Sequence, residues 1–195
     1  APRRAFRPVP ARWPASGDGI RVEVARLSHP RPAELEAIID RLERCNSALV
    51  ACPDPAQVDA AALLAFGRHL GLHRPDSNLC ADEQAVSAIA VRARGQASEY
   101  IPYTNRPLSW HTDGYYNVRG SEVRAWTLFC VCDAADGGEN GLLDPEIAYL
   151  LLRDEDPALV GALMDPDAMR IPANVQGGTL LRPASAGPVF SVIEG

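Results

Sequence analysis

The sequence predicts an α+β fold with a mostly antiparallel sheet. Segments with the pattern of strands outnumber the helical segments, and the helical segments fall into two groups between them. The length of 195 residues, with 47% hydrophobic and 23% charged residues, suits one globular domain with a sizeable core. We therefore expect a single domain over residues 19–195, after an N-terminal arm over residues 1–18 that is rich in arginine and proline.

The first elements follow from local periodicity. Residues 19–27 (GIRVEVARL) alternate between apolar and polar, as a half-buried strand does. Residues 47–52 (SALVAC) predict a short buried strand, and Asp54 predicts the N-cap of a second helix that ends at His69. The first helix is expected from Pro32, with one apolar face formed by Leu35, Ile38, Ile39 and Leu42.

The central part of the chain contains two further strand candidates, residues 85–92 and residues 122–132 (EVRAWTLFCVC). The second is the strongest strand pattern in the chain, and the glycine-containing stretch 133–140 predicts a turn after it. Residues 99–116 are rich in aromatic residues, Pro and Asn and have weak periodicity. This composition is typical of either a long functional loop or an irregular strand.

Two helices and two strands are expected in the last third of the chain. Asp144 and Pro145 predict the N-cap and first residue of a helix, because proline is well tolerated at the first helical position. A second short helix is expected from Pro157. Residues 168–175 and 188–193 then predict the final strands.

The composition excludes several classes of function. The net charge of -6 argues against a nucleic-acid partner, because counterion-driven binding requires a basic face. No apolar run approaches the roughly 20 residues of a membrane-spanning helix, and the first 17 residues lack the apolar core of a secretory signal. We therefore expect a cytoplasmic protein that binds neither nucleic acid nor a membrane, with a homo-oligomer as an open possibility.

The cysteines fit a reducing compartment. Their number, five, is odd, and none are in CxxC spacing, which argues against both a disulfide framework and a structural zinc site. Cys130 and Cys132 would lie on the same side of the expected strand, where we expect them to be small buried hydrophobic residues.

The stretch SWHTDGYYN (109–117) contains a candidate metal site. On an extended strand, residues i and i+2 point to the same face, so His111 and Asp113 can converge on one ion. These ligand types, with a second histidine, form the facial triad of non-haem Fe(II) oxygenases. His-x-Asp pairs also occur by chance, and the alternative is a surface turn in which Asp113 caps a backbone amide before Gly114.

The neighbouring sequence resembles one known family. YTNRPLSWHTDGYYN, the later GGEN, and LLDPEIAYLLLRDEDPALVGALMDPDAMRIPAN together closely resemble the taurine dioxygenase-like (TauD/TfdA) family, from about Glu99 to Val192. The resemblance implies a double-stranded β-helix, or jelly-roll, core of the clavaminate synthase-like type with flanking helices. It also implies an Fe(II)-dependent oxygenase that hydroxylates a small polar or acidic molecule and decarboxylates its cosubstrate 2-oxoglutarate to succinate.

The resemblance also implies roles for single residues. His111 and Asp113 match the first two metal ligands of the family, and no further catalytic residue is expected. Asn140, at the end of GGEN, is a candidate for contact with 2-oxoglutarate, and the alternative is a simple turn asparagine. The family contacts substrate with the stretch just before the metal histidine, which makes Asn105 the best substrate-binding candidate, and the nearby rings of Tyr103 and Tyr115 are further candidates.

The sequence departs from the family at the second half of the metal site. The family has a further ligand histidine far downstream, followed by an arginine that binds 2-oxoglutarate, and no histidine follows His111 here. Arg182, the last arginine, lies in a loop-like stretch. The expectation is therefore an incomplete jelly roll that lacks its C-terminal strands. The alternative is a non-catalytic family member that acts as a binding or assembly module.

Overall fold

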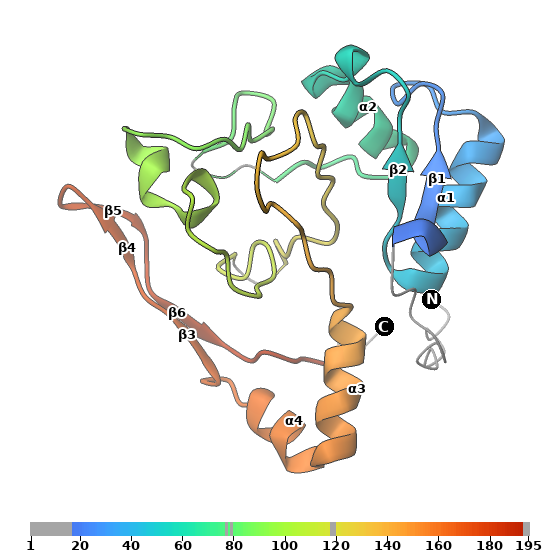
Figure 1. Cartoon of the computed structure of the whole chain (residues 1–195). Coiled ribbons are helices and arrows are strands. Elements are labelled where there is room, and N and C mark those ends of the chain that lie inside the picture. Colours follow the sequence, from blue (N-terminus) through green and yellow to red (C-terminus); the bar gives the residue numbers. More distant parts are fainter. Residues whose placement is uncertain (1–16, 77, 79, 118–119, 193–195) are drawn as a thin grey trace. The chain divides into compact units, whose positions relative to one another are not determined.

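The computed structural model describes residues 17–76, 78, 80–117 and 120–192 (Figure 1). The described residues form two compact units, one within Ser16–Asp133 and one within Ala134–Gly195, and each is described by itself. The expected N-terminal arm lies outside the described residues except at its end, where the 3₁₀ turn η1 (Gly17–Ile20) begins. The expected single domain over residues 19–195 stays a prediction.

The unit Ser16–Asp133 begins with a strand–helix–strand motif. Strand β1 (Arg21–Glu23) and strand β2 (Leu49–Ala51) pair in parallel, with Val22 opposite Val50. Helix α1 (Pro32–Cys45) connects them (Figure 1). The strands are parallel because a helical crossover returns the chain to the end of the sheet where β1 began. The sheet was expected to be mostly antiparallel, and this pair is an exception.

The core of this unit confirms the alternation predicted for residues 19–27. Val22 and Val24 are buried while the residues beside them are exposed. Val24 and Ile38 of α1 are fully buried. The apolar face predicted for α1 is narrower than expected, because Ile39 is 43% exposed. The buried core cluster consists of Val22, Val24, Leu27, Ile38 and Phe66.

Helix α1 is fixed at its start by Glu34. This side chain is only 6% exposed, and its carboxylate accepts hydrogen bonds from the backbone N–H of Arg31 at 2.7 Å and of Ala25 at 3.1 Å. The guanidinium of Arg31 donates to the same carboxylate, with Nε 2.8 Å away. The hydrogen bonds from the Arg31 side chain and backbone lower the pKa of Glu34 from 4.5 to about 2. This glutamate therefore joins the end of β1 to the first turn of α1.

Helix α2 (Ala60–His69) begins five residues later than the sequence indicated. Its N-cap is Asp59, whose carboxylate accepts from the Ala62 backbone N–H at 2.8 Å. Asp54 instead precedes the 3₁₀ turn η2 (Pro55–Gln57). The prediction that Asp54 caps the helix was wrong because the chain returns to an extended conformation at Val58 before α2 starts.

Residues 80–133 are mostly irregular. The 3₁₀ turns η3 (Gln96–Glu99) and η4 (Ile101–Tyr103) are their helical elements, so the stretch 99–116 is a long loop rather than a strand. The strands predicted at 85–92 and 122–132 were wrong: neither pairs with another strand in the part of the chain that the structure describes. A strand requires partners for its backbone N–H and C=O groups, and local alternation cannot supply them.

The segment 122–132 exposes side chains that a paired strand would bury. Trp126 is 52% exposed and Val131 is 83% exposed. Cys130 and Cys132 are exposed as well, so their predicted burial was wrong. The Cys130 thiol donates to the Asp133 carboxylate at 3.4 Å, and this contact raises the pKa of the thiol. Within the described residues, the strands therefore do not close into a jelly roll.

In the second unit, both helices start where the sequence predicted. Helix α3 (Pro145–Glu155) is capped by Asp144, which accepts from the Glu146 backbone N–H at 2.9 Å. Helix α4 (Pro157–Leu163) is capped by Asp156 in the same way through Ala158, also at 2.9 Å. Both helices combine an aspartate N-cap with proline in the first turn, which is why the local sequence was sufficient to locate them.

The second unit contains a long antiparallel hairpin made of two successive strand pairs (Figure 1). Its strands are β3 (Met169–Ile171), β4 (Asn174–Gln176), β5 (Thr179–Arg182) and β6 (Ser185–Gly187). Strand β3 pairs with β6, and β4 pairs with β5 next to the turn. The turn is Gly177–Gly178, and both glycines have the positive φ that a tight hairpin turn requires. Arg182 ends a strand rather than lying in a loop, and its guanidinium donates to the Pro172 carbonyl at 2.9 Å. The strand predicted at 188–193 was wrong for residues 188–192, which are irregular, and residue 193 lies outside the described residues.

Candidate metal centre

The predicted metal pair comes together in an exposed turn of the unit Ser16–Asp133. His111 Nε2 lies 3.7 Å from Asp113 Oδ1, and the two side chains are 41% and 56% exposed. The other ring nitrogen, Nδ1, lies 2.8 Å from the carbonyl oxygen of Ser109. The backbone two residues before the histidine therefore fixes the orientation of the imidazole ring.

This arrangement determines which nitrogen can bind a metal. A carbonyl oxygen only accepts hydrogen bonds, so Nδ1 must carry the proton that is donated to Ser109. In the neutral ring, Nε2 then presents a lone pair toward the Asp113 carboxylate. Two lone pairs that face each other repel unless a cation lies between them. The donor set of this turn, one imidazole nitrogen and one carboxylate, therefore fits a shared metal ion.

The spacing between the two donors can be compared with a metal's reach. With metal–nitrogen and metal–oxygen bonds of roughly 2.1 Å, two donors on one ion are at most about 4.2 Å apart, or about 3.0 Å at a right angle. The 3.7 Å separation lies within that reach. Both side chains are partly exposed and can close the remaining distance by small rotations.

Gly114 holds the turn that follows the pair. Its φ is +65°, and a Cβ atom placed there would lie 2.4 Å from Cγ2 of Val123. The Asn117 backbone N–H donates to the Gly114 carbonyl at 2.8 Å, and its side-chain amide donates to Asp76 at 3.2 Å. Among the described residues, the Asp113 carboxylate contacts His111 rather than capping the turn. The turn positions the carboxylate without using its oxygen atoms.

A complete metal site is not present in the described part of the chain. No group of three or more His, Cys, Asp or Glu side chains there could hold a metal ion. The pair His111–Asp113 therefore accounts for two donors, and a third donor is not identified among the residues that the structure describes.

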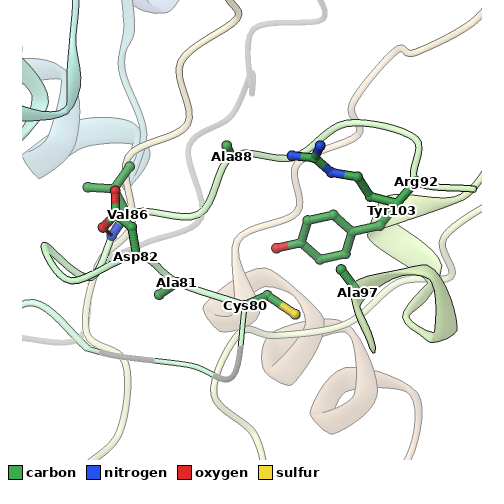
Figure 2. A pocket seen from close by; sticks show the side chains of 8 residues that line it. All are labelled: Cys80, Ala81, Asp82, Val86, Ala88, Arg92, Ala97 and Tyr103. Atoms are coloured by element: carbon green, nitrogen blue, oxygen red, sulfur yellow. Dashed lines mark hydrogen bonds between the residues drawn. The ribbon is translucent and has the colours of Figure 1, made fainter. Parts of the chain in front are cut away.

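The substrate-binding candidates differ in their surroundings. Tyr103 is buried, 6% exposed, and lines a cavity (Figure 2). Asn105 and Tyr115 are exposed, and the Tyr115 ring packs edge-to-face against Tyr116 with the ring centroids 5.2 Å apart. Tyr103 is thus the one of these three that the structure brings to a cavity.

Asn140 belongs to the unit Ala134–Gly195. Its side-chain amide is exposed and donates to the Gly138 carbonyl at 3.3 Å, and Gly137 and Gly138 both have positive φ. This is the contact of a turn asparagine. Its role toward 2-oxoglutarate stays a prediction.

Sequence reasoning missed two residues that line the same cavity as Tyr103. Cys80 and Arg92 come from parts of the chain 23 and 11 positions before the tyrosine, and both border the cavity (Figure 2). Arg92 ended a segment that was expected to be a strand. The Arg92 N–H donates to the Tyr103 carbonyl at 2.9 Å, and this non-local contact has no signature in sequence spacing.

Comparison with known proteins identifies the family. Residues 7–188 match the model of the "Taurine catabolism dioxygenase TauD, TfdA family". A uridine-5'-phosphate dioxygenase from Streptomyces sp. is 27% identical over 156 residues, which cover 78% of this chain and 56% of that relative. The chain thus spans little more than half the length of this curated relative. No solved structure matches.

The family match covers nearly the whole chain and includes the candidate metal pair. Within the described residues, none of the helices is both long enough and apolar enough to cross a bilayer. The family implies a double-stranded β-helix fold, and the structure shows mixed helices and short strands. The chain belongs to the TauD/TfdA family of dioxygenases.

Proposed function

We propose that this chain provides part of an Fe(II)- and 2-oxoglutarate-dependent dioxygenase site, with His111 and Asp113 as two of the metal ligands. The observation that carries the proposal is the 3.7 Å approach of His111 Nε2 to Asp113 Oδ1. Iron with 2-oxoglutarate would supply the oxidation of a C–H bond of the substrate, with succinate as the second product. A cytoplasmic location is part of the proposal.

The residues of the turn have separate tasks in this function. The Ser109 carbonyl holds the His111 proton on Nδ1 and leaves Nε2 available to the metal. Gly114 and Asn117 hold the turn, so Asp113 keeps both carboxylate oxygens available. The third ligand and the groups that bind 2-oxoglutarate would come from outside this turn, with Asn140 as a candidate for the cosubstrate.

The proposed substrate is a small polar or acidic molecule that Tyr103, Asn105 and Tyr115 would contact. The name of the Streptomyces relative, a uridine-5'-phosphate dioxygenase, supports an acidic substrate. Uridine-5'-phosphate is therefore the first compound to test.

Metal titration tests the proposal at its foundation. The purified chain should bind Co(II) or Mn(II), as oxygen-stable substitutes for Fe(II), and His111→Ala should abolish this binding. Two donors bind weakly, so we expect a dissociation constant far above that of a complete three-ligand site. The matched control is His73→Ala, which removes an exposed histidine of the same unit and should leave the affinity unchanged. If His111→Ala binds Co(II) or Mn(II) with the same affinity as the parent chain, His111 is not a metal ligand.

Turnover distinguishes the enzyme from a non-catalytic module. With excess Fe(II) and ascorbate, the 195-residue chain should form little succinate from 2-oxoglutarate, because its metal pair lacks an identified third donor. Succinate formation that appears when a longer form of the protein is used would support the enzyme. Metal binding with no succinate in any form would favour a binding or assembly role.

A further inference from the structure

The cavity beside Tyr103 is built by a short stretch of chain, residues 80–103 (Figure 2). Its volume is about 370 Å³. Two backbone hydrogen bonds hold its wall, one from Arg92 to Tyr103 and one from Asp82 to Val86, both 2.9 Å long. Sites for small molecules are usually roughly 300–1,000 Å³ in volume. The cavity is therefore large enough for a small organic molecule.

One end of the cavity carries two hydrogen-bond donors. Figure 2 shows the phenol of Tyr103 pointing into the cavity, between the side chains of Arg92 and Cys80. Arg92 is exposed, and among the described residues no carboxylate forms an ion pair with it. The pKa of Tyr103 is raised from its ordinary value. Burial is the main cause, a hydrogen bond with Ser87 opposes it, and the charge of Cys80 and a hydrogen bond with it add to it. The raised pKa keeps the phenol protonated at neutral pH, and a bound oxyanion would replace Cys80 as the hydrogen-bond partner of its single O–H.

The acidic side chain that lines the cavity lies away from Tyr103. Asp82 lies at the end opposite Arg92 (Figure 2). Its carboxylate Oδ1 accepts from the backbone N–H groups of Gln84 and Val86, both at 2.9 Å. Arg92 is the charged side chain beside Tyr103, while Asp82 lies at the far end, so Arg92 determines what the Tyr103 end attracts (Figure 2).

We propose that this cavity binds the oxyanion group of a small molecule, with Arg92 as the charged donor and Tyr103 as the neutral donor. The planar guanidinium matches the geometry of a carboxylate or a phosphate and can donate two parallel hydrogen bonds to it. Three alanines in the wall leave space for the rest of a small ligand.

The assignment deepens the proposed function and rests on it in one respect, namely that the bound molecule is the substrate. The cavity and the metal turn lie in the same unit of the chain. The side-chain amide of Asn117, in the metal turn, donates to Asp76 at 3.2 Å, just before the segment that lines the cavity. Binding of the oxyanion requires no metal, so it can be measured separately.

Calorimetric titration of the metal-free chain with methyl phosphate and with acetate tests the site. Arg92→Gln should weaken binding about ten- to a hundredfold, as expected for hydrogen bonds to a charged group. Tyr103→Phe should weaken it about two- to tenfold and keeps the ring that fills the wall. The matched control is Arg94→Gln, an exposed arginine two residues away that does not line the cavity, and it should bind as the parent does.

The two ligands and a metal-ligand variant separate the outcomes. Whichever ligand binds more tightly identifies the oxyanion as phosphate or carboxylate, and either result supports the site if it depends on Arg92. Equal weakening by Arg92→Gln and Arg94→Gln, or no weakening by Arg92→Gln, overturns it. His111→Ala should leave anion binding unchanged. If anions bind through Arg92 but the chain binds no metal, the cavity assignment stands and the proposed function fails.

Discussion

At the scale of the residue, neighbouring backbone groups orient the two candidate metal ligands, His111 and Asp113. His111 is directed by the Ser109 carbonyl, and Asp113 is presented by a turn that Gly114 and Asn117 hold. The sequence correctly suggested that His111 and Asp113 approach each other, although the motif lies in a turn rather than on a strand. It could not indicate the role of Ser109, because a backbone carbonyl leaves no trace in residue type.

Gly114→Ala should destabilise the turn that carries His111 and Asp113. The backbone φ at Gly114 is +65°, which is unfavourable for a residue with a side chain. The Cβ of alanine would also lie 2.4 Å from Cγ2 of Val123. We expect a loss of about 1–3 kcal/mol in the free energy of unfolding, measured in urea, and weaker Co(II) binding. Gly120→Ala is the control, because Gly120 has φ +88° with no atom within 4 Å of the added Cβ. Equal losses in the two variants would show that contact with Val123 is unimportant.

Glu34 should make stability depend on acid pH. Its pKa is about 2 in the folded chain and its ordinary value is 4.5, so the folded state binds the proton less tightly. The stabilisation is therefore fully present above pH 4.5 and is lost as the pH falls from 4.5 toward 2. Glu34→Gln should lower stability at pH 7 and reduce the slope over this range in urea titrations. Glu36→Gln, at an exposed position of α1, should leave the slope unchanged.

At the scale of the element, helices were predicted well and strands poorly. The starts of α3 and α4 were located from aspartate and proline at adjacent positions, because a cap is a contact between near neighbours. The segment 122–132 has the best strand pattern in the chain and yet does not pair with another strand in the described structure. A strand depends on partners that are distant in sequence, and its own residues do not identify them.

Helix α1 allows a direct test of which apolar positions form the core. Ile38 is 1% exposed and Ile39 is 43% exposed, although both were predicted to lie on the same apolar face. Ile38→Ala should lower the free energy of unfolding by about 2–5 kcal/mol, because it leaves a cavity beside Val24 and Phe66. Ile39→Ala should cost less than about 1 kcal/mol. Urea denaturation of the two variants measures the difference, and similar losses would contradict the described packing.

At the scale of the whole molecule, the family was predictable from the sequence, the metal role of His111 and Asp113 stays a prediction, and the described residues do not form a closed jelly roll. The stretch around His111, together with residues 137–140 and 142–174, resembled the TauD/TfdA family, and the family match over residues 7–188 confirms this prediction. The jelly roll requires strands from distant parts of a chain to pair, and the described residues form only three two-stranded sheets. Cys80, Arg92 and Tyr103 were not connected by sequence reasoning for the same cause, since a cavity is a product of tertiary contacts.

The exposed segment 122–132 should make the chain self-associate. In the described structure it belongs to no sheet, and most of its apolar side chains are exposed, with Leu128 at 54% and Val131 at 83%. An extended apolar segment outside any described sheet offers a template for strand pairing with another copy, and a lysine there blocks it. Sedimentation velocity should show association that increases with concentration, and Leu128→Lys should reduce it. Leu151→Lys is the control, because Leu151 is 64% exposed but lies on α3, where the backbone is hydrogen-bonded within the helix. A monomer at every concentration, or equal effects of the two lysines, would contradict pairing through this segment.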